Sequence, residues 1–297
     1  MARLMTVVAL VACLAGSAGP AAANPATGWN ALALVTVTKS VPLKGGGIKT
    51  VTAKCPKGLT PLTGGAFVFE EGHGPAPDQA LVTRLVASYP SAKGWTASGY
   101  NLGGPADLDL EAIAQCGGFE NQFVKASLVI SPGVSFSTTV GCPTQDGFTA
   151  NAYGAGGFLS GSKAALAADS GITETILDNI PWRWTVGAEN RGQKPFSLTL
   201  VAVCAGFTLD YENVQIVTQS GIAPGATAGG NIQCPAGSHA MAGSAAFING
   251  SSNAMTGFTE LASSSMTVDS SGWYFAALNR GFAAADFTAF VYCLKDD

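Results

Sequence analysis

Six cysteines divide most of the chain into three similar parts. Within each pair the cysteines lie roughly 60 residues apart, and the pairs recur at an interval of about 88 residues. The pairs are Cys55/Cys116, Cys142/Cys204 and Cys234/Cys293. The first cysteine of every pair is followed by proline, and a stretch of small residues ending in Phe comes next. A period of this length indicates that one structural unit is used three times.

A second motif, Trp-x5-Asn-x-Gly, precedes the last cysteine of each pair. It occurs at 94–103 (GWTASGYNLG), 183–192 (RWTVGAENRG) and 272–281 (GWYFAALNRG). Its invariant residues are Trp95, Trp184 and Trp273, with Asn101, Asn190 and Asn279. The motif is either a ligand site used three times or a structural element used three times.

The residues around this motif alternate between apolar and polar side chains. In LDLEAIAQC, alternate positions from Leu108 to Cys116 are apolar or cysteine, whereas Asp109 and Glu111 lie on the other face. A period of two predicts half-buried β-strands. Because Asn and Gly tolerate positive φ, we expect a β-hairpin with Asn-x-Gly at its tip.

The predicted fold is therefore all-β, with three disulfide-bonded antiparallel β units. The units pack as a pseudo-threefold, prism-like body or lie in a tandem row, and the sequence leaves both arrangements open. The predicted boundaries are 33–118, 119–207 and 208–297, after a lead at 24–32. The segments 68–93, 159–182 and 248–271 differ most between the units, so we expect variable loops there that carry any specificity.

An even number of cysteines in an exported chain predicts disulfides. Pairing within each unit is the simplest connectivity, and pairing between units is the alternative. Closing a loop of about 60 residues stabilises a protein by roughly 4 kcal/mol in the chain-entropy model. The disulfides thus account for a large share of the expected stability.

Residues 1–23 have the pattern of a secretory signal peptide. Arg3 precedes a short apolar run, and Ala21-Ala22-Ala23 offers the small residues that a signal peptidase needs. The expected location is extracellular. The sequence Leu10-Val11-Ala12-Cys13 supplies an alternative, in which the chain is cleaved as a lipoprotein and anchored at Cys13.

The chain resembles a group of secreted bacterial proteins that carry Cys-Pro-x-Gly, Gly-Gly and a later Gly-Trp with Asn. The motifs that carry the resemblance are CPKG (55–58), CPAG (234–237) and the three Trp-x5-Asn-x-Gly segments. The second unit departs from the pattern with CPTQDG at 142–147. The resemblance covers most of the mature chain and implies no particular activity.

Composition excludes some classes of partner. Charged residues make up 11% of the chain, its net charge is −4, and no basic cluster occurs, so we expect no nucleic-acid partner. No cofactor or metal is expected either, because no Cys-x-x-Cys occurs in the mature chain and each mature cysteine has a disulfide partner in view.

Two small groups of residues are candidates for a site. Glu70, Glu71 and His73 lie in FEEGHGPAPD, where two carboxylates and an imidazole are suited to acid–base chemistry or to a metal ion; a solvated loop is the alternative. Trp182 and Arg183 lie outside the repeat pattern and offer a surface for stacking. The repeated tryptophans share a face with apolar residues, so we expect each to pack inward on the disulfide of its unit.

The favoured function is a secreted, non-catalytic protein that binds a surface polymer, a glycan or a partner protein, or forms part of the cell exterior. Two alternatives stay open: an extracellular hydrolase that uses the Glu70 loop, and a membrane-active or pore-forming protein. The sequence leaves the oligomeric state and the ligand undetermined.

Overall fold

The computed structural model describes most of the 297-residue chain. The described ranges are 34–70, 77–103, 108–145, 148–149, 151–161, 170–178, 183–205, 213–248 and 259–295. This part of the protein consists of β-strands and one short 3₁₀ helix, η2 (Pro77–Leu81), with no α-helix among its elements. The prediction of an all-β protein is confirmed.

The strands form four sheets, three of six strands and one of two strands. Sheet A contains, in spatial order, β1 (Val35–Pro42), β6 (Leu108–Gly117), β3 (Thr60–Glu70), β18 (Thr259–Met266), β19 (Gly272–Asn279) and β16 (Thr227–Gln233). Sheet B contains β2 (Ile48–Lys54), β5 (Gly94–Asn101), β4 (Thr83–Ser91), β11 (Asn151–Ser160), β14 (Phe196–Ala205) and β7 (Asn121–Ile130). Sheet C contains β15 (Asn213–Ile222), β20 (Ala285–Lys295), β17 (Ser238–Ile248), β12 (Ser170–Asp178), β13 (Arg183–Asn190) and β8 (Val134–Gly141). The small sheet pairs β9 (Thr144–Gln145) with β10 (Phe148–Thr149).

Each large sheet is shared between two parts of the chain. We call β1–β6 the first strand group, β7–β14 the second and β15–β20 the third; each group gives three strands to one large sheet and three to another. The strands are thus organised in four sheets, and the prediction of three separate β units of about 88 residues is wrong in this respect. Alternation shows that a strand has an inner face, but it does not show which strand lies beside it.

The halves of each large sheet meet at a seam with little backbone pairing. In sheet A, β18 pairs with β3 at Ser264 and Ala66, and in sheet C, β12 pairs with β17 at Thr175 and Ala245. In sheet B, β11 and β4 pair at Gly157–Ser88 and Phe158–Ala87. The seam strands β4, β12 and β18 come from the segments 68–93, 159–182 and 248–271. The sequence predicted variable loops in these segments. They contain central strands of the sheets instead.

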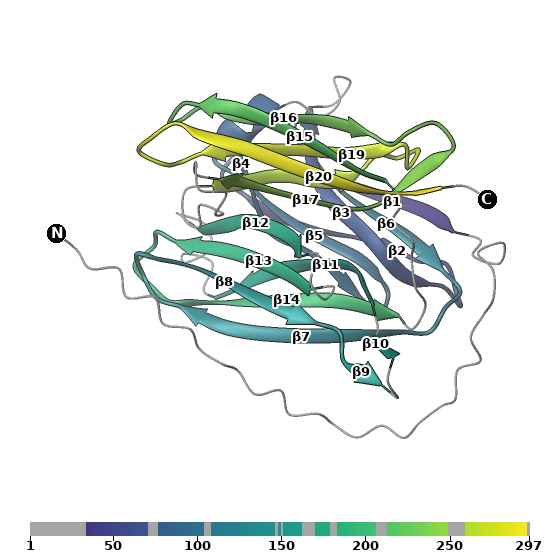
Figure 1. The fold of residues 1–297 in the computed structure, drawn as a ribbon. Helices are drawn as coiled ribbons and strands as arrows, with labels where there is room; N and C mark the ends of the chain where they lie inside the picture. Colours follow the sequence, from purple (N-terminus) through teal and green to yellow (C-terminus); the bar gives the residue numbers. More distant parts are fainter. Residues whose placement is uncertain are drawn as a thin grey trace.

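The sheets also meet at corners, where consecutive strands belong to different sheets. β1 contacts β2 between sheets A and B, β7 contacts β8 between B and C, and β15 contacts β16 between C and A. Figure 1 shows the third group across the top of the view and the second group across the bottom.

The disulfides are Cys55–Cys116, Cys142–Cys204 and Cys234–Cys293, as the spacing predicted. Each joins a cysteine just after an edge strand of one sheet to a strand of another sheet.

The ends of β6, β14 and β20 that carry cysteine lie together, and we call this end of the body the cysteine end. Here β3, β11 and β17 each have a bulge, at Leu62, Tyr153 and Met241. The three bulged side chains are buried in one apolar cluster with Leu294 and Ala205. A bulge re-aims one side chain out of the alternation, so these residues from three groups close the core at this end.

The Asn-x-Gly turn joins strands of two different sheets, so the predicted hairpin is wrong. β5 and β6 lie in sheets B and A, and the equivalent strands of the other groups are separated in the same way. Among the described residues of the three Asn-x-Gly segments, only Gly103 has positive φ. The Asn side chains instead fix a corner between sheets, because each Nδ2 donates to a distant backbone carbonyl. The pairs are Asn101 with Leu43, Asn190 with Ile130, and Asn279 with Ile222.

Replacing Asn190 by Ala should lower the free energy of unfolding by about 1–3 kcal/mol, the usual cost of leaving buried polar groups unpaired. The fully buried Asn190 donates to the carbonyls of Ile130 and Lys194 at 2.9 Å and accepts from the Gly192 amide at 3.0 Å. Urea titration measures the change. The exposed pair Thr139–Thr185 supplies the control, because Thr139→Ala should alter stability by less than about 0.5 kcal/mol. Equal effects of the two substitutions would contradict the corner role.

Candidate functional site

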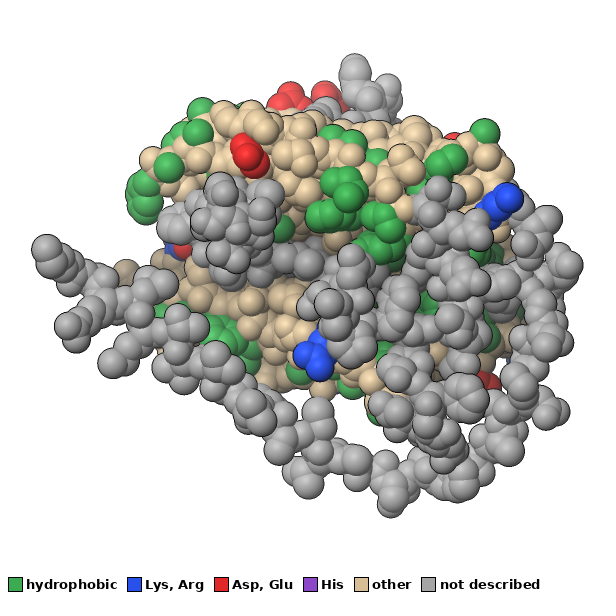
Figure 2. All heavy atoms as spheres, in the orientation of Figure 1, with side chains coloured by type: hydrophobic (Ala, Val, Ile, Leu, Met, Phe, Trp, Pro, Cys, Tyr) green, Lys and Arg blue, Asp and Glu red, His purple; other side chains and the backbone are tan. Residues whose placement is uncertain are grey.

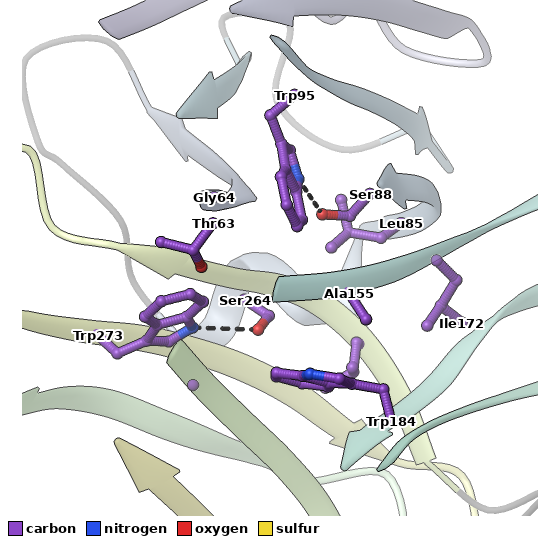
Figure 3. A pocket seen from close by; sticks show the side chains of 12 residues that line it. Thr63, Gly64, Leu85, Ser88, Trp95, Ala155, Ile172, Trp184, Ser264 and Trp273 are labelled. Carbon is purple, nitrogen blue, oxygen red and sulfur yellow. Dashed lines mark hydrogen bonds between the residues drawn. The ribbon is translucent and has the colours of Figure 1, made fainter. Parts of the chain in front are cut away.

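The three repeated tryptophans line one small cavity in the middle of the body. Figure 3 shows Trp95, Trp184 and Trp273 pointing toward this space from different strands. Trp95 Nε1 donates to Ser88 Oγ at 3.0 Å and Trp273 Nε1 donates to Ser264 Oγ at 3.2 Å. Sequence analysis placed each ring against the disulfide of its own unit; it did not foresee a space shared by all three.

The local sequence explains why the rings fit there. Gly243 lies against the face of Trp273, where a Cβ atom would overlap the indole, and Gly64 lies against Trp95 in the same way. In the second group Ala155 lines the cavity, and Trp184 Nε1 donates to the Ala152 carbonyl at 3.3 Å instead of to a hydroxyl. The small-residue stretches found in the sequence thus make room for the tryptophans.

This cavity is too small for a ligand. Its volume is about 20 Å³, which is close to the space of a single water molecule, whereas ligand pockets measure hundreds of Å³. The repeated tryptophans therefore form core and do not line a ligand site.

The structure describes one residue of each predicted site group, Glu70 and Arg183, and these two lie in different sheets. Glu70 is the exposed last residue of β3 and pairs with Leu108, far along the strand from Cys116. Arg183 is the exposed first residue of β13 and pairs with Gly141, beside Cys142. Glu71, His73 and Trp182 lie outside the described residues.

Carboxylates also lie on the outer face of sheet A. Asp109 and Glu111 alternate there on β6, and burial raises the pKa of Glu111, an effect that the Thr38 hydroxyl partly offsets by hydrogen bonding. Within the described ranges, no group of three His, Cys, Asp or Glu side chains is arranged to hold a metal ion.

A network of charged residues at the end opposite the cysteines was missed by sequence analysis. Glu260 forms an ion pair with Arg84, with 2.7 Å between Oε1 and Nε, and accepts a hydrogen bond from Arg280 Nε at 2.8 Å. Glu189 pairs with Arg191. We call this end the arginine end. The sequence feature that could have indicated this network is Arg in the middle position of two Asn-x-Gly turns, Arg191 and Arg280. Their partner Glu260 lies in a segment without repeat similarity.

Burial has the largest effect on the Glu189 carboxyl of this network. It raises the pKa of Glu189, and the adjacent Arg191 opposes that shift. Glu260 and Arg280 are also close enough to act on the Glu189 carboxylate, the first raising its pKa and the second lowering it. The Glu189–Arg191 pair therefore lies close to the Glu260–Arg280 pair.

The outer faces of the three large sheets differ in their side chains and in what covers them. On sheet A, η2 lies against β16, β18 and β19, and burial raises the pKa of Tyr274 on β19. On sheet C, Val214 and Ile216 are exposed on β15. In Figure 2 most of the described surface on the visible side is uncharged, with a few charged side chains scattered over it.

The outer face of sheet B combines aromatic rings with rows of hydroxyl groups. Tyr89 of β4 and Phe158 of β11 meet at the seam, with ring centroids 4.6 Å apart and planes tilted by 41°, and both are half-buried. Hydroxyl pairs flank them on both sides of the seam: Thr50–Ser98, Thr52–Thr96 and Ser127–Thr199. Among the outward positions of the described strands of sheet B there is no carboxylate. This face can pack against an apolar surface and exchange hydrogen bonds through its hydroxyls, and exposed lysines lie on its two edge strands, Lys54 on β2 and Lys125 on β7.

No protein-family model matches the chain, and no curated protein matches it either. In the portion of the chain described above, no helix is long and apolar enough to cross a membrane. Three disulfides are typical of extracellular proteins.

Proposed function

We propose that this is a secreted, non-catalytic protein that binds an uncharged extracellular glycan on the outer face of sheet B. The observation that carries the proposal is the half-exposed pair Tyr89 and Phe158 among hydroxyl side chains. An aromatic ring packs against the apolar C–H face of a sugar, and Ser and Thr hydroxyls both donate and accept hydrogen bonds.

The outward side chains beside the aromatic pair are hydroxyls, Thr96 and Thr199, and the lysines of this face lie on its edge strands, so a ligand at the seam meets rings and hydroxyls. The face is also held rigidly, because it spans a disulfide-stabilised body and lies on strands rather than on loops. A rigid, weakly polar surface loses little conformational entropy when a polymer binds.

We further propose that the three strand groups surround a pseudo-threefold axis as a prism-like body. When the short strands β9 and β10 of the second group are left out of the numbering, each large sheet joins the first, sixth and third strands of one group to the fourth, fifth and second of another, which supports this arrangement. The three outer faces then occupy equivalent places, and their different side chains give them different functions. The signal-like residues 1–23 and the three disulfides support export of the protein.

The test is retention of the mature protein on a panel of insoluble neutral polysaccharides, followed by affinity measurement on the polymer that retains it. Tyr89→Ser should weaken binding about tenfold or more, as for a central aromatic contact. Phe282→Ser removes a ring that is 94% exposed outside sheet B and should bind like the wild type. Failure of every polysaccharide to retain the protein, or equal affinity of Tyr89→Ser and wild type, would overturn the proposal.

The same samples distinguish the alternative functions. A hydrolase would release soluble reducing ends from the retained polymer, and a membrane-active protein would release dye from liposomes. We expect neither release.

A further inference from the structure

Two buried serine hydroxyls face the small cavity between the three tryptophan rings. Ser88 of β4 and Ser264 of β18 both line this cavity, and both residues are buried. The two strands belong to different sheets and to different strand groups, since β4 lies in sheet B and β18 in sheet A. Figure 3 shows both hydroxyls beside the space toward which the rings point. The fold therefore brings two polar groups from distant parts of the chain to one place in the core.

Each of these hydroxyls already serves as a hydrogen-bond acceptor. The indole Nε1 of Trp95 donates to Ser88 Oγ at 3.0 Å, and that of Trp273 donates to Ser264 Oγ at 3.2 Å. Because an indole N–H can only donate, neither bond uses the proton of the serine hydroxyl. Neither serine side chain donates a hydrogen bond to another residue in the described part of the chain. A buried donor without an acceptor costs free energy, so both protons favour an acceptor inside the cavity.

The cavity has the right size for one such acceptor. Its volume of about 20 Å³ admits a single water molecule. A buried water is held by roughly two to four polar partners, and the two serines supply two of them. The other walls are the indole rings and apolar side chains such as Leu85, Ile172 and Leu261. The protons of a water at this place would face the rings, whose π-electrons are weak acceptors.

We propose that this cavity binds one water molecule, which accepts hydrogen bonds from the hydroxyls of Ser88 and Ser264. The water connects the seam strands of two sheets, because Ser88 pairs with Gly157 across the seam of sheet B and Ser264 pairs with Ala66 across the seam of sheet A. Both seams have little backbone pairing, so the water adds a polar link where the backbone supplies few. The site lies inside the body and does not depend on the glycan face.

The test is a high-resolution crystal structure of the mature protein, with a second crystal pressurised with xenon. We expect a water peak in the cavity at about 2.5–3.0 Å from both Ser88 Oγ and Ser264 Oγ, the usual distance between oxygens in a hydrogen bond. Xenon enters dry apolar cavities, so we expect no xenon peak at this place. The proposal is overturned if the cavity shows no water density, if the water contacts only one of the serines, or if xenon occupies the cavity.

Two substitutions at neighbouring positions of β18 show whether the hydroxyl holds the water. Ser264→Ala leaves Trp273 Nε1 without its acceptor, so the water should move to about 3 Å from this nitrogen and accept from it. Ser265→Ala is the matched control, because Ser265 is also buried but lies on the opposite face of the strand, where its hydroxyl donates to the Met266 carbonyl at 3.2 Å. In this variant the water should keep its position. A water that also keeps its position in Ser264→Ala would contradict the role of Ser264.

Discussion

Reduction of the three disulfides should unfold the mature protein in buffer, or bring it to the edge of unfolding. Each bond closes a loop with a sequence separation between 59 and 62, which corresponds to about 4 kcal/mol in the chain-entropy model. Together the bonds supply about as much as the whole stability of a typical domain, roughly 5–15 kcal/mol. Each also joins two sheets at a corner, so its loss allows sheets to separate. Urea titrations with and without dithiothreitol, followed by tryptophan fluorescence, measure the effect.

Removal of a single disulfide measures how much one corner contributes to the free energy of unfolding. Cys234→Ser with Cys293→Ser should lower the free energy of unfolding by about 4 kcal/mol and leave the other two disulfides intact. Peptide mapping under non-reducing conditions confirms which bonds remain. If the fully reduced protein kept the urea midpoint of the oxidised form, the corners would be held without the disulfides and this part of the account would be wrong.

Glu260→Gln should lower the free energy of unfolding by about 3–5 kcal/mol, the usual cost of removing one partner from a buried ion pair. Glu260 lies between Arg84 and Arg280, and its replacement leaves the buried Arg84 guanidinium without the opposite charge 2.7 Å away. The neutral amide cannot replace this interaction. Thermal and urea unfolding report the loss.

The exposed Glu120 provides the same chemical change without burial. Glu120→Gln should shift stability by less than about 0.5 kcal/mol. A Glu260→Gln protein as stable as Glu120→Gln would show that the network at the arginine end contributes nothing net to folding.

Local features of the fold could be predicted from the sequence, because they depend on neighbouring residues. The alternation from Leu108 to Cys116 correctly predicted a strand whose inward residues are buried. The disulfides followed from equal spacing. The partner of each strand could not be predicted, because a strand with an apolar inner face satisfies the same pattern whether its neighbour comes from the same group or from another.

The Asn-x-Gly turn shows this limit most clearly. Alternation before and after Asn101 is consistent with a hairpin and with a corner between two sheets. The difference lies in the Asn101 side chain, which donates to the Leu43 carbonyl, a residue distant in sequence. Such a contact has no local signature.

The candidate binding surface and the charged network were beyond prediction for the same reason. Tyr89 belongs to the first strand group and Phe158 to the second, and nothing in either segment indicates that their rings meet. Glu260 and Arg84 are likewise distant in sequence. The sequence predicted that the divergent segments carry any specificity. Tyr89, Arg84 and Glu260 lie in two of these segments.

The proposed glycan face depends on the central claim that each large sheet is shared between two strand groups. The most direct measurement is a NOESY spectrum of the mature protein that covers the seam of sheet B. The account predicts cross-strand NOEs between backbone protons of Ser88 and Gly157, and between those of Ala87 and Phe158. Absence of these NOEs, with cross-strand NOEs found only within each strand group, would contradict it.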